Sequence, residues 1–193
     1  MTQPMMTLAQ AATALQGETS APDVSFSRVN TDSRAVEPGD LFIALKGERF
    51  DAHDFVAQAL SDGAAAALVN QGYQGEPGQP LLRVADTHVA LGQLAACWRQ
   101  RFSLPVAGIT GSNGKTSVKE MVAAILNAAV GEDQVLATRG NLNNDIGMPL
   151  TLLRLRAQHR YAVLEMGMNH LGEIAYLSKL AQPNVTVINN AQA

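Results

Sequence analysis

Short apolar runs alternate with helix-like segments from residue 106 to the end of the sequence. Runs of four or five mainly apolar residues predict buried strands, and apolar residues spaced three and four apart predict helices. The predicted strands span 106–109, 135–138, 161–165 and 185–188, and the predicted helices span 116–129, about 148–155 and 171–181. This alternation indicates an α/β domain with a parallel sheet, in which ligands gather at the carboxyl ends of the strands.

The first 85 residues predict a smaller α/β unit. Thr7 is the expected N-cap of a first helix and Gly17 its stop, and the alternation of apolar and polar residues over 24–29 indicates a strand. Further strands are expected at 41–45, 65–69 and 81–84, with a helix at about 53–61 and another from 87 to about 102. We therefore expect two domains, 1–85 and 86–193. Because the second ends just after a strand, we expect it to be incomplete.

The segment 110–117 reads Thr-Gly-Ser-Asn-Gly-Lys-Thr-Ser and lies between a predicted strand and a predicted helix. Glycines allow backbone amides to turn towards a phosphate, a helix N-terminus adds positive potential, a lysine reaches the terminal phosphates and a hydroxyl can hold magnesium. The strict phosphate-loop pattern is not met, because Ile109 stands where its first glycine belongs. A tight turn of small residues is the alternative, but Gly-Lys-Thr in this context favours a nucleoside-triphosphate site.

Glu165 ends the apolar strand 161–165, so the parallel sheet should bring it to the edge that carries the phosphate loop. There its carboxylate could hold magnesium together with Thr116. Capping of the next helix is the alternative for Glu165, and His170 is equally well explained as a helix-cap residue.

Two further polar loops are ambiguous. The asparagine-rich loop 140–147 supplies neutral donors and acceptors that suit an amide or peptide ligand, although asparagines are also common in turns. In the charged loop 46–54, Lys46 and Arg49 could bind a diphosphate, but exposed loop charges are usually only solvated, and His53 is explained as a residue at the start of a helix.

The composition narrows the function classes. Apolar residues make up 47% and charged residues 16% of the sequence, and the net charge is -3. Basic residues are scattered, so no nucleic-acid partner is expected. The sequence shows neither a signal-peptide pattern nor an apolar run of membrane-spanning length, so we expect a cytoplasmic protein without a membrane partner.

Several of these motifs together resemble the Mur ligase family of cell-wall synthesis. The loop 110–117 resembles its ATP loop, and the segments 44–55, 140–147 and 165–174 narrow the resemblance. It implies a uridine-diphosphate-binding N-terminal domain and a central ATPase domain that uses ATP and Mg²⁺. By resemblance, ATP is bound by Thr110, Gly111, Ser112, Asn113, Gly114, Lys115, Thr116 and Ser117. Lys115 and Glu165 are the implied catalytic residues, and Thr116 and Glu165 the implied metal ligands. Substrate binding is assigned to Thr31, Asp32, Ser33, Arg34, Lys46, Asn143, Asn144 and His170.

The resemblance also implies a reaction. The terminal carboxylate of UDP-N-acetylmuramoyl-tripeptide is phosphorylated to an acyl phosphate, which the amine of D-alanyl-D-alanine attacks during synthesis of peptidoglycan precursors. Members of the family extend further, with additional magnesium ligands and a third domain, so we expect this chain alone to lack ligase activity, and we expect a monomer. The alternatives are another Mur-type or folylpolyglutamate synthase-like ligase, or a non-catalytic phosphate-loop switch.

Overall fold

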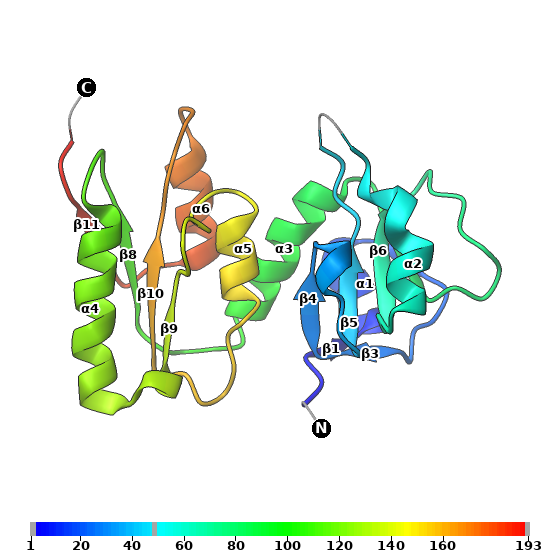
Figure 1. Ribbon diagram of the computed structural model, residues 1–193, viewed down its shortest axis with the longest axis horizontal. Helices are drawn as coiled ribbons and strands as arrows, with labels where there is room; N and C mark the ends of the chain where they lie inside the picture. Colours follow the sequence, from blue (N-terminus) through cyan, green and yellow to red (C-terminus); the bar gives the residue numbers. More distant parts are fainter. Residues whose placement is uncertain (1–2, 48–49, 192–193) are drawn as a thin grey trace. The chain divides into compact units, whose positions relative to one another are not determined.

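The computed structural model describes residues 3–47 and 50–191. The chain divides into two compact units, Met1–Leu94 and Ala95–Ala193, each with its own sheet (Figure 1). The division falls within helix α3 (Thr87–Arg99), whereas the sequence predicts a boundary at its start. Each unit is an α/β fold with a mainly parallel sheet, which confirms the predicted fold class.

The N-terminal unit contains a five-stranded sheet in the order β2-β7-β6-β5-β4, in which only β2 is antiparallel to its neighbour. A separate antiparallel pair joins β1 to β3. The strands are β1 (Met6–Thr7), β2 (Glu18–Thr19), β3 (Ser25–Phe26), β4 (Arg28–Asn30), β5 (Asp40–Ile43), β6 (Ala66–Asn70) and β7 (Leu81–Val84). The helices are α1 (Leu8–Leu15), the short 3-10 helices η1 (Ser33–Ala35) and η2 (Ala52–Phe55), and α2 (Val56–Ser61).

The first helix begins as its sequence predicts. Thr7 caps α1, and its hydroxyl accepts from the Gln10 backbone while the Gln10 side chain accepts from the Thr7 backbone, which forms a capping box. The left-handed residue that ends the helix is Gln16, with φ of 52°, rather than the expected Gly17. A side chain at position 17 would meet the Arg83 carbonyl 2.6 Å from its Cβ, so this glycine serves close packing against β7.

The single strand expected at 24–29 is wrong. Phe26 pairs with β1, whereas Arg28 pairs with β5, so β3 and β4 belong to different sheets. Between them the Ser27 backbone N–H donates to the Gly39 carbonyl at 2.9 Å, which turns the chain from one sheet to the other. The alternating pattern is real, but it spans two short strands with different partners.

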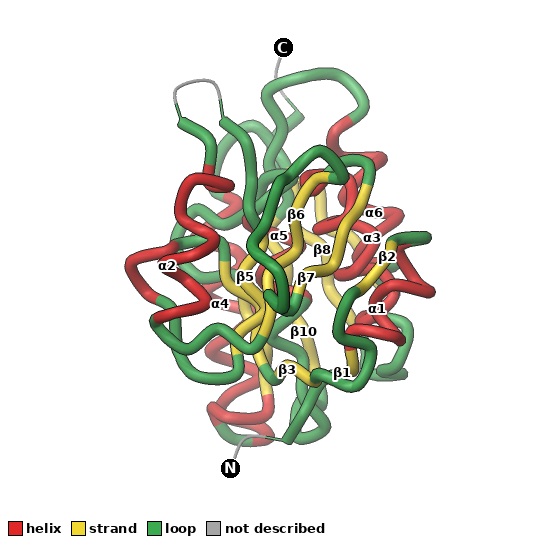
Figure 2. Tube along the Cα trace, turned by 90° about the vertical axis from the view of Figure 1, so that its right-hand side faces the viewer, coloured by secondary structure: helices red, strands yellow, loops and turns green. Residues whose placement is uncertain are grey.

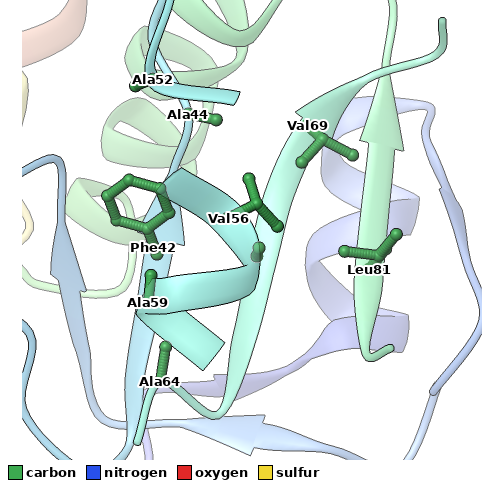
Figure 3. Packing of buried hydrophobic residues seen from close by; sticks show 9 residues of the cluster. Phe42, Ala44, Ala52, Val56, Ala59, Ala64, Val69 and Leu81 are labelled. Carbon is green, nitrogen blue, oxygen red and sulfur yellow. The ribbon is translucent and has the colours of Figure 1, made fainter. Parts of the chain in front are cut away.

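Apolar side chains of β5, β6 and β7 pack beneath α2 in the N-terminal unit (Figure 3). Phe42 is fully buried there against Val56 and Ala59 of the helix. Helix α1 lies on the opposite face of this sheet (Figure 2). Because both faces are covered, the strands read as nearly continuous apolar runs, as expected for a parallel sheet.

The C-terminal unit has four parallel strands in the order β11-β8-β10-β9. They are β8 (Val106–Thr110), β9 (Val135–Ala137), β10 (Tyr161–Glu165) and β11 (Val185–Ile188). The helices are α4 (Lys115–Val130), the 3-10 helix η3 (Glu132–Gln134), α5 (Gly147–Leu152) and α6 (Glu173–Ala181). In the register, Ile109 of β8 lies beside Glu165 of β10 on one side and Val187 of β11 on the other.

Helices α4 and α6 cover opposite faces of this sheet (Figures 1 and 2). Among the apolar residues of α4, Val118, Val122 and Leu126 pack on the sheet. Met121 and Ile125 of the same helix are 59% and 69% exposed. Among the described residues, no helix has the length and apolar character needed to cross a lipid bilayer.

Candidate functional site

The segment between β8 and α4 forms a tight loop that excludes side chains at two glycines. Gly111 has φ of 140° and Gly114 has φ of 74°, both in a region that favours glycine. A Cβ on Gly111 would lie 1.7 Å from the Asn189 carbonyl oxygen, and one on Gly114 would lie 2.4 Å from Asn189 Nδ2. The glycines are therefore required both by the backbone conformation and by the close approach of the segment that follows β11.

Hydrogen bonds from that segment hold the loop. The Asn189 backbone N–H donates to the Thr110 carbonyl, and the Ser112 N–H donates to the Asn190 carbonyl, each at 2.8 Å. Asn189 Nδ2 donates to the Asn113 carbonyl at 2.9 Å. Within the loop itself, Lys115 Nζ donates to the Gly111 carbonyl at 2.7 Å. The loop is thus fixed by the segment that follows β11, the strand paired with β8. The sequence pattern did not indicate that Asn189 and Asn190 have this role.

The loop presents the N-terminus of α4 to a cavity of about 540 Å³. The helix's own ladder begins with the bond from Val118 N–H to the Gly114 carbonyl, so the amides of residues 115–117 have no acceptor within the helix. Together with the Lys115 ammonium these amides favour an anion at this end of the helix. The cavity is lined by Thr110, Gly111, Ser112, Lys115, Met168, Ile174, Ile188, Asn190 and Ala191.

Glu165 lies beside this loop, as its place at the end of a parallel strand predicts. The residue is 2% exposed, and its carboxylate accepts from Thr116 Oγ1 at 2.9 Å and from Asn143 Nδ2 at 2.7 Å. The structure thus joins both predicted metal ligands and one predicted substrate residue in a single cluster. Helix capping does not explain this carboxylate, because its oxygens accept from side chains of other segments.

Two buried residues that the sequence pattern did not single out support Glu165. Thr138 follows β9, and its Oγ1 accepts from the Glu165 backbone N–H at 3.0 Å. The Thr138 carbonyl accepts from Lys119 Nζ at 2.9 Å, and this ammonium also contacts the Glu120 carboxylate. Lys119 is only 1% exposed and lies one turn after Thr116 on α4. The one feature of the sequence that could have indicated the contact between Lys119 and Thr138 is the presence of a lysine among the apolar residues of this helix.

The cluster suits a magnesium ion that is also bound by phosphates. Within residues 3–47 and 50–191, no group of three or more His, Cys, Asp or Glu side chains could hold a metal ion. Mg²⁺ keeps several waters and is commonly bound by one or two carboxylates plus substrate phosphates, so such a group is not needed. One buried carboxylate and one hydroxyl at the phosphate loop fit that mode of binding.

Two asparagines of the loop 140–147 have different roles. Asn143 faces Glu165, and its carbonyl accepts from the Gly167 N–H at 2.8 Å. Asn144 Oδ1 instead accepts from the Gly147 N–H at 2.8 Å and so supports the start of α5. Both residues line a second cavity of about 180 Å³, together with Lys115, Asp145, Gly167, Met168, Asn169 and Glu173. This cavity places neutral amide groups beside the phosphate loop.

His170 lies in the turn before α6 with an exposed side chain. Its backbone N–H and that of Asn169 donate to Glu173 Oε2, at 3.2 and 2.6 Å. These bonds lower the pKa of Glu173, and the bond from Asn169 has the largest effect. Glu173 thereby caps this turn, while the role of the His170 side chain in substrate binding stays a prediction.

The predicted substrate residues of the N-terminal unit occupy the turn after β4. Asp32 caps η1 by accepting from the Arg34 N–H, and its carboxylate forms an ion pair with the Arg34 guanidinium at 2.8 Å. This side-chain pairing holds the pKa of Asp32 down at about 2. Thr31 and Ser33 are half-buried beside the pair. The pair is exposed at Arg34, so a ligand could replace either partner.

Lys46 lies after β5 with a side chain that is 70% exposed, and its Nζ is 3.5 Å from Asp51 Oδ2. Arg49, the other cation expected at this loop, lies outside the described residues. Lys46 belongs to the N-terminal unit, whereas Lys115, Glu165, Asn143, Asn144 and His170 belong to the C-terminal unit. The expected substrate-binding residues are therefore distributed over both units.

Comparison with protein families gives two matches along this chain. A model described as "Mur ligase family, catalytic domain" matches residues 25–99, and one described as "Mur ligase middle domain" matches residues 109–193. The first match contains the Asp32–Arg34 turn and Lys46. The second contains the phosphate loop from Thr110, together with Asn143 and Glu165.

Individual relatives agree with these matches. The UDP-N-acetylmuramoyl-tripeptide--D-alanyl-D-alanine ligase of Escherichia coli is 50% identical over 188 residues, which are 97% of this chain and 40% of the relative. The Bacillus subtilis protein of the same name is 47% identical and is matched over 84% of this chain and 35% of its own length. A crystal structure of MurF from Acinetobacter baumannii superposes with a TM-score of 0.87 at 48% identity, covering 96% of this chain and 41% of that one. The MurF ligase of Thermotoga maritima, solved in complex with ADP, gives a TM-score of 0.75 at 37% identity, covering 84% of this chain and 37% of that one. The chain thus spans about 40% of the length of the first of these relatives.

Proposed function

Because this chain belongs to the Mur ligase family, we propose that it contributes the substrate-binding and nucleotide-binding regions of an ATP-dependent peptide ligase. In this proposal the enzyme joins D-alanyl-D-alanine to the tripeptide carboxylate of UDP-N-acetylmuramoyl-tripeptide. The names of its relatives support that substrate pair. A role in peptidoglycan precursor synthesis follows from it.

One observation carries the proposal. The phosphate loop, the buried Glu165 carboxylate and the Asn143 amide meet at the carboxyl edge of the sheet, and Thr116 Oγ1 and Asn143 Nδ2 donate to that carboxylate. The described residues of this cluster offer a cation, helix amides and a metal-binding carboxylate, which stabilise charge on a transferring phosphoryl group.

The proposed reaction has two steps. An oxygen of the tripeptide carboxylate attacks the γ-phosphorus of ATP, ADP leaves, and an acyl phosphate results. The amine of D-alanyl-D-alanine then attacks the acyl carbon, loses a proton and expels inorganic phosphate. A carboxylate is a poor electrophile, so the first step converts its oxygen into a good leaving group before the peptide bond forms.

The residues of this chain bind and orient the reactants. Lys115 exchanges its bond to the Gly111 carbonyl for a terminal phosphate oxygen, and the amides of residues 115–117 bind the phosphates. Thr116 and Glu165 would hold Mg²⁺, which neutralises charge on the phosphates when bound. Asn143 keeps Glu165 oriented and lines the smaller cavity, where the peptide end of the substrate would enter.

Calorimetric titration of this chain tests the proposal at both units. Micromolar binding of UDP-N-acetylmuramoyl-tripeptide, with weaker binding of UDP alone and a measurable loss of affinity in Lys46→Ala, would support it. Lys179→Ala is the matched control, because it removes the same charge from a position on α6, outside the N-terminal unit. Binding of Mg-ATP without any binding of the UDP-substrate would contradict the ligase proposal and would favour a nucleotide switch.

A further inference from the structure

A chain of polar contacts in the N-terminal unit is centred on His53, a residue that the nucleotide site does not use. His53 Nδ1 lies 2.5 Å from Asp51 Oδ1, and His53 Nε2 accepts from the Asn70 backbone N–H at 3.0 Å. The imidazole is largely buried, with 11% of its side chain exposed, and its ring centroid lies 5.7 Å from that of Tyr73. The ring therefore joins η2 to the end of β6.

The contacts assign the tautomer of the ring. A backbone N–H can only donate, so Nε2 must carry a lone pair to accept from Asn70. The single proton of the neutral imidazole then resides on Nδ1, from which it is donated to the Asp51 carboxylate. The opposite tautomer would place a proton against the Asn70 N–H and would face Asp51 with a lone pair, so neither contact would be made.

The contacts continue beyond Asn70 to the start of α3. Asn70 Oδ1 accepts from the Thr87 backbone N–H at 3.0 Å, and Thr87 Oγ1 donates to the Ala44 carbonyl at 2.8 Å. Thr87 is 2% exposed, so these bonds are shielded from water. His53 is thus anchored to the carboxyl edge of β5 and β6, the edge at which parallel sheets bind ligands.

On its other side, His53 fixes the residue that pairs with Lys46. Asp51 forms an isolated antiparallel bridge with Lys46, and its Oδ2 lies 3.5 Å from Lys46 Nζ. The His53 backbone N–H also donates to Asp51 Oδ1, and this bond is the main reason that the pKa of Asp51 is lowered. Asp51 therefore presents one oxygen to His53 and the other to Lys46.

From this connected geometry we infer that His53 is a positioning residue, which as the Nδ1–H tautomer orients Asp51 and, through it, the Lys46 ammonium for the diphosphate of the substrate. The inference rests on the proposed function, because only an enzyme that binds the UDP-substrate brings a diphosphate to Lys46. The imidazole itself is too enclosed to serve as the ligand-binding group. Its effect is to reduce the freedom of an otherwise exposed lysine side chain.

Two substitutions separate the two ends of the imidazole. In His53→Gln, the amide oxygen can still accept from Asn70, but the proton donor to Asp51 is lost. In His53→Asn, the amide nitrogen can still donate to Asp51, but the Asn70 N–H loses its acceptor. We expect His53→Gln to weaken UDP-N-acetylmuramoyl-tripeptide binding roughly tenfold, and His53→Asn to lower the melting temperature with a smaller loss of affinity.

A double-mutant cycle with Lys46→Ala decides whether His53 acts through Lys46. If it does, His53→Gln should add little further loss of affinity to the Lys46→Ala variant. A purely structural His53 would give losses that simply add. Additive losses, or wild-type affinity in His53→Gln, would overturn the inference.

An NMR measurement distinguishes failure of this inference from failure of the proposed function. Imidazole ¹⁵N shifts of His53 report its tautomer without any ligand. If the wild-type chain does not bind the UDP-substrate, the proposed function fails together with the Lys46 role that depends on it. Observation of the Nε2–H tautomer would overturn the positioning inference by itself, whether or not the substrate binds.

Discussion

Replacement of Glu165 by glutamine tests the metal-binding role without a large change of shape. Glu165 is buried, and its two oxygens accept from Thr116 Oγ1 and Asn143 Nδ2. In Glu165→Gln, the amide oxygen can continue to accept from Asn143, while the amide nitrogen donates to the Thr116 hydroxyl, which can rotate to accept. Both contacts survive, so we expect the melting temperature to change little.

Magnesium binding should respond very differently, because the substitution removes the carboxylate charge. Two unit charges about 4 Å apart at an effective dielectric constant of about 20 interact by roughly 4 kcal/mol. Waters that replace the carboxylate recover part of this energy. We therefore expect the apparent affinity for magnesium in the nucleotide complex to fall at least about tenfold, which corresponds to about 1.4 kcal/mol.

Calorimetric titration with ATP, in saturating magnesium and in EDTA, separates the two effects. The affinity of Glu165→Gln should be reduced in magnesium and nearly unchanged in EDTA. Glu132→Gln is the matched control, because it removes the same charge from an exposed position in η3, next to the amino end of β9. Wild-type affinity of Glu165→Gln in magnesium would refute the metal-binding role, and a large loss in EDTA would show that the loop itself had been disturbed.

Three further substitutions test other parts of the structure. Gly111→Ala places a Cβ 1.7 Å from a carbonyl oxygen at φ of 140°, so it should abolish nucleotide binding in the same titration and destabilise the C-terminal unit by more than about 2 kcal/mol in urea; wild-type behaviour would contradict the loop geometry. Arg28→Ala should destabilise the N-terminal unit by about 2–4 kcal/mol in urea unfolding, because the buried Asp40 loses an ion pair of 2.6 Å. The same truncation at the exposed Arg34 should destabilise the unit far less, because water screens that pair, and equal losses would refute this distinction. Arg34→Ala should also raise the pKa of Asp32 from about 2 towards 3.8 in an NMR titration, whereas an unchanged value would show that Arg34 is not the cause. Since the folded pKa is depressed, the small stability contribution of Asp32 is complete above pH 3.8 and is lost as the pH falls towards 2.

The elements of the C-terminal unit could be predicted closely from the sequence. Strand β10 has the predicted bounds, and α4 differs from its prediction by one residue at each end. Buried parallel strands and the glycine loop carry strong local signals, and the position of Glu165 follows from the parallel arrangement alone. The cluster of Lys115, Thr116 and Glu165 could therefore be predicted from strand order and local motifs.

What the sequence did not reveal depends on contacts between distant segments. The strand expected at 24–29 divides because its two halves find different partners, and no local pattern records that choice. The role of Thr138 depends on a hydrogen bond to Glu165, 27 residues away. The sequence indicates only that His53 is a residue at the start of a helix. Its Nε2 accepts from the Asn70 N–H only when β6 lies beside η2 in the folded chain.

The hydrogen bonds from the segment after β11 to the phosphate loop have a consequence for the order in which the chain can assemble. Asn189 Nδ2 contacts the Asn113 carbonyl across 76 positions of sequence. During synthesis, residues 110–117 leave the ribosome long before Asn189 has been added to the chain. The loop can therefore reach its final conformation only after Asn189 has been synthesised. Nucleotide can therefore assist folding of the unit only at a late stage, after β11 has paired with β8.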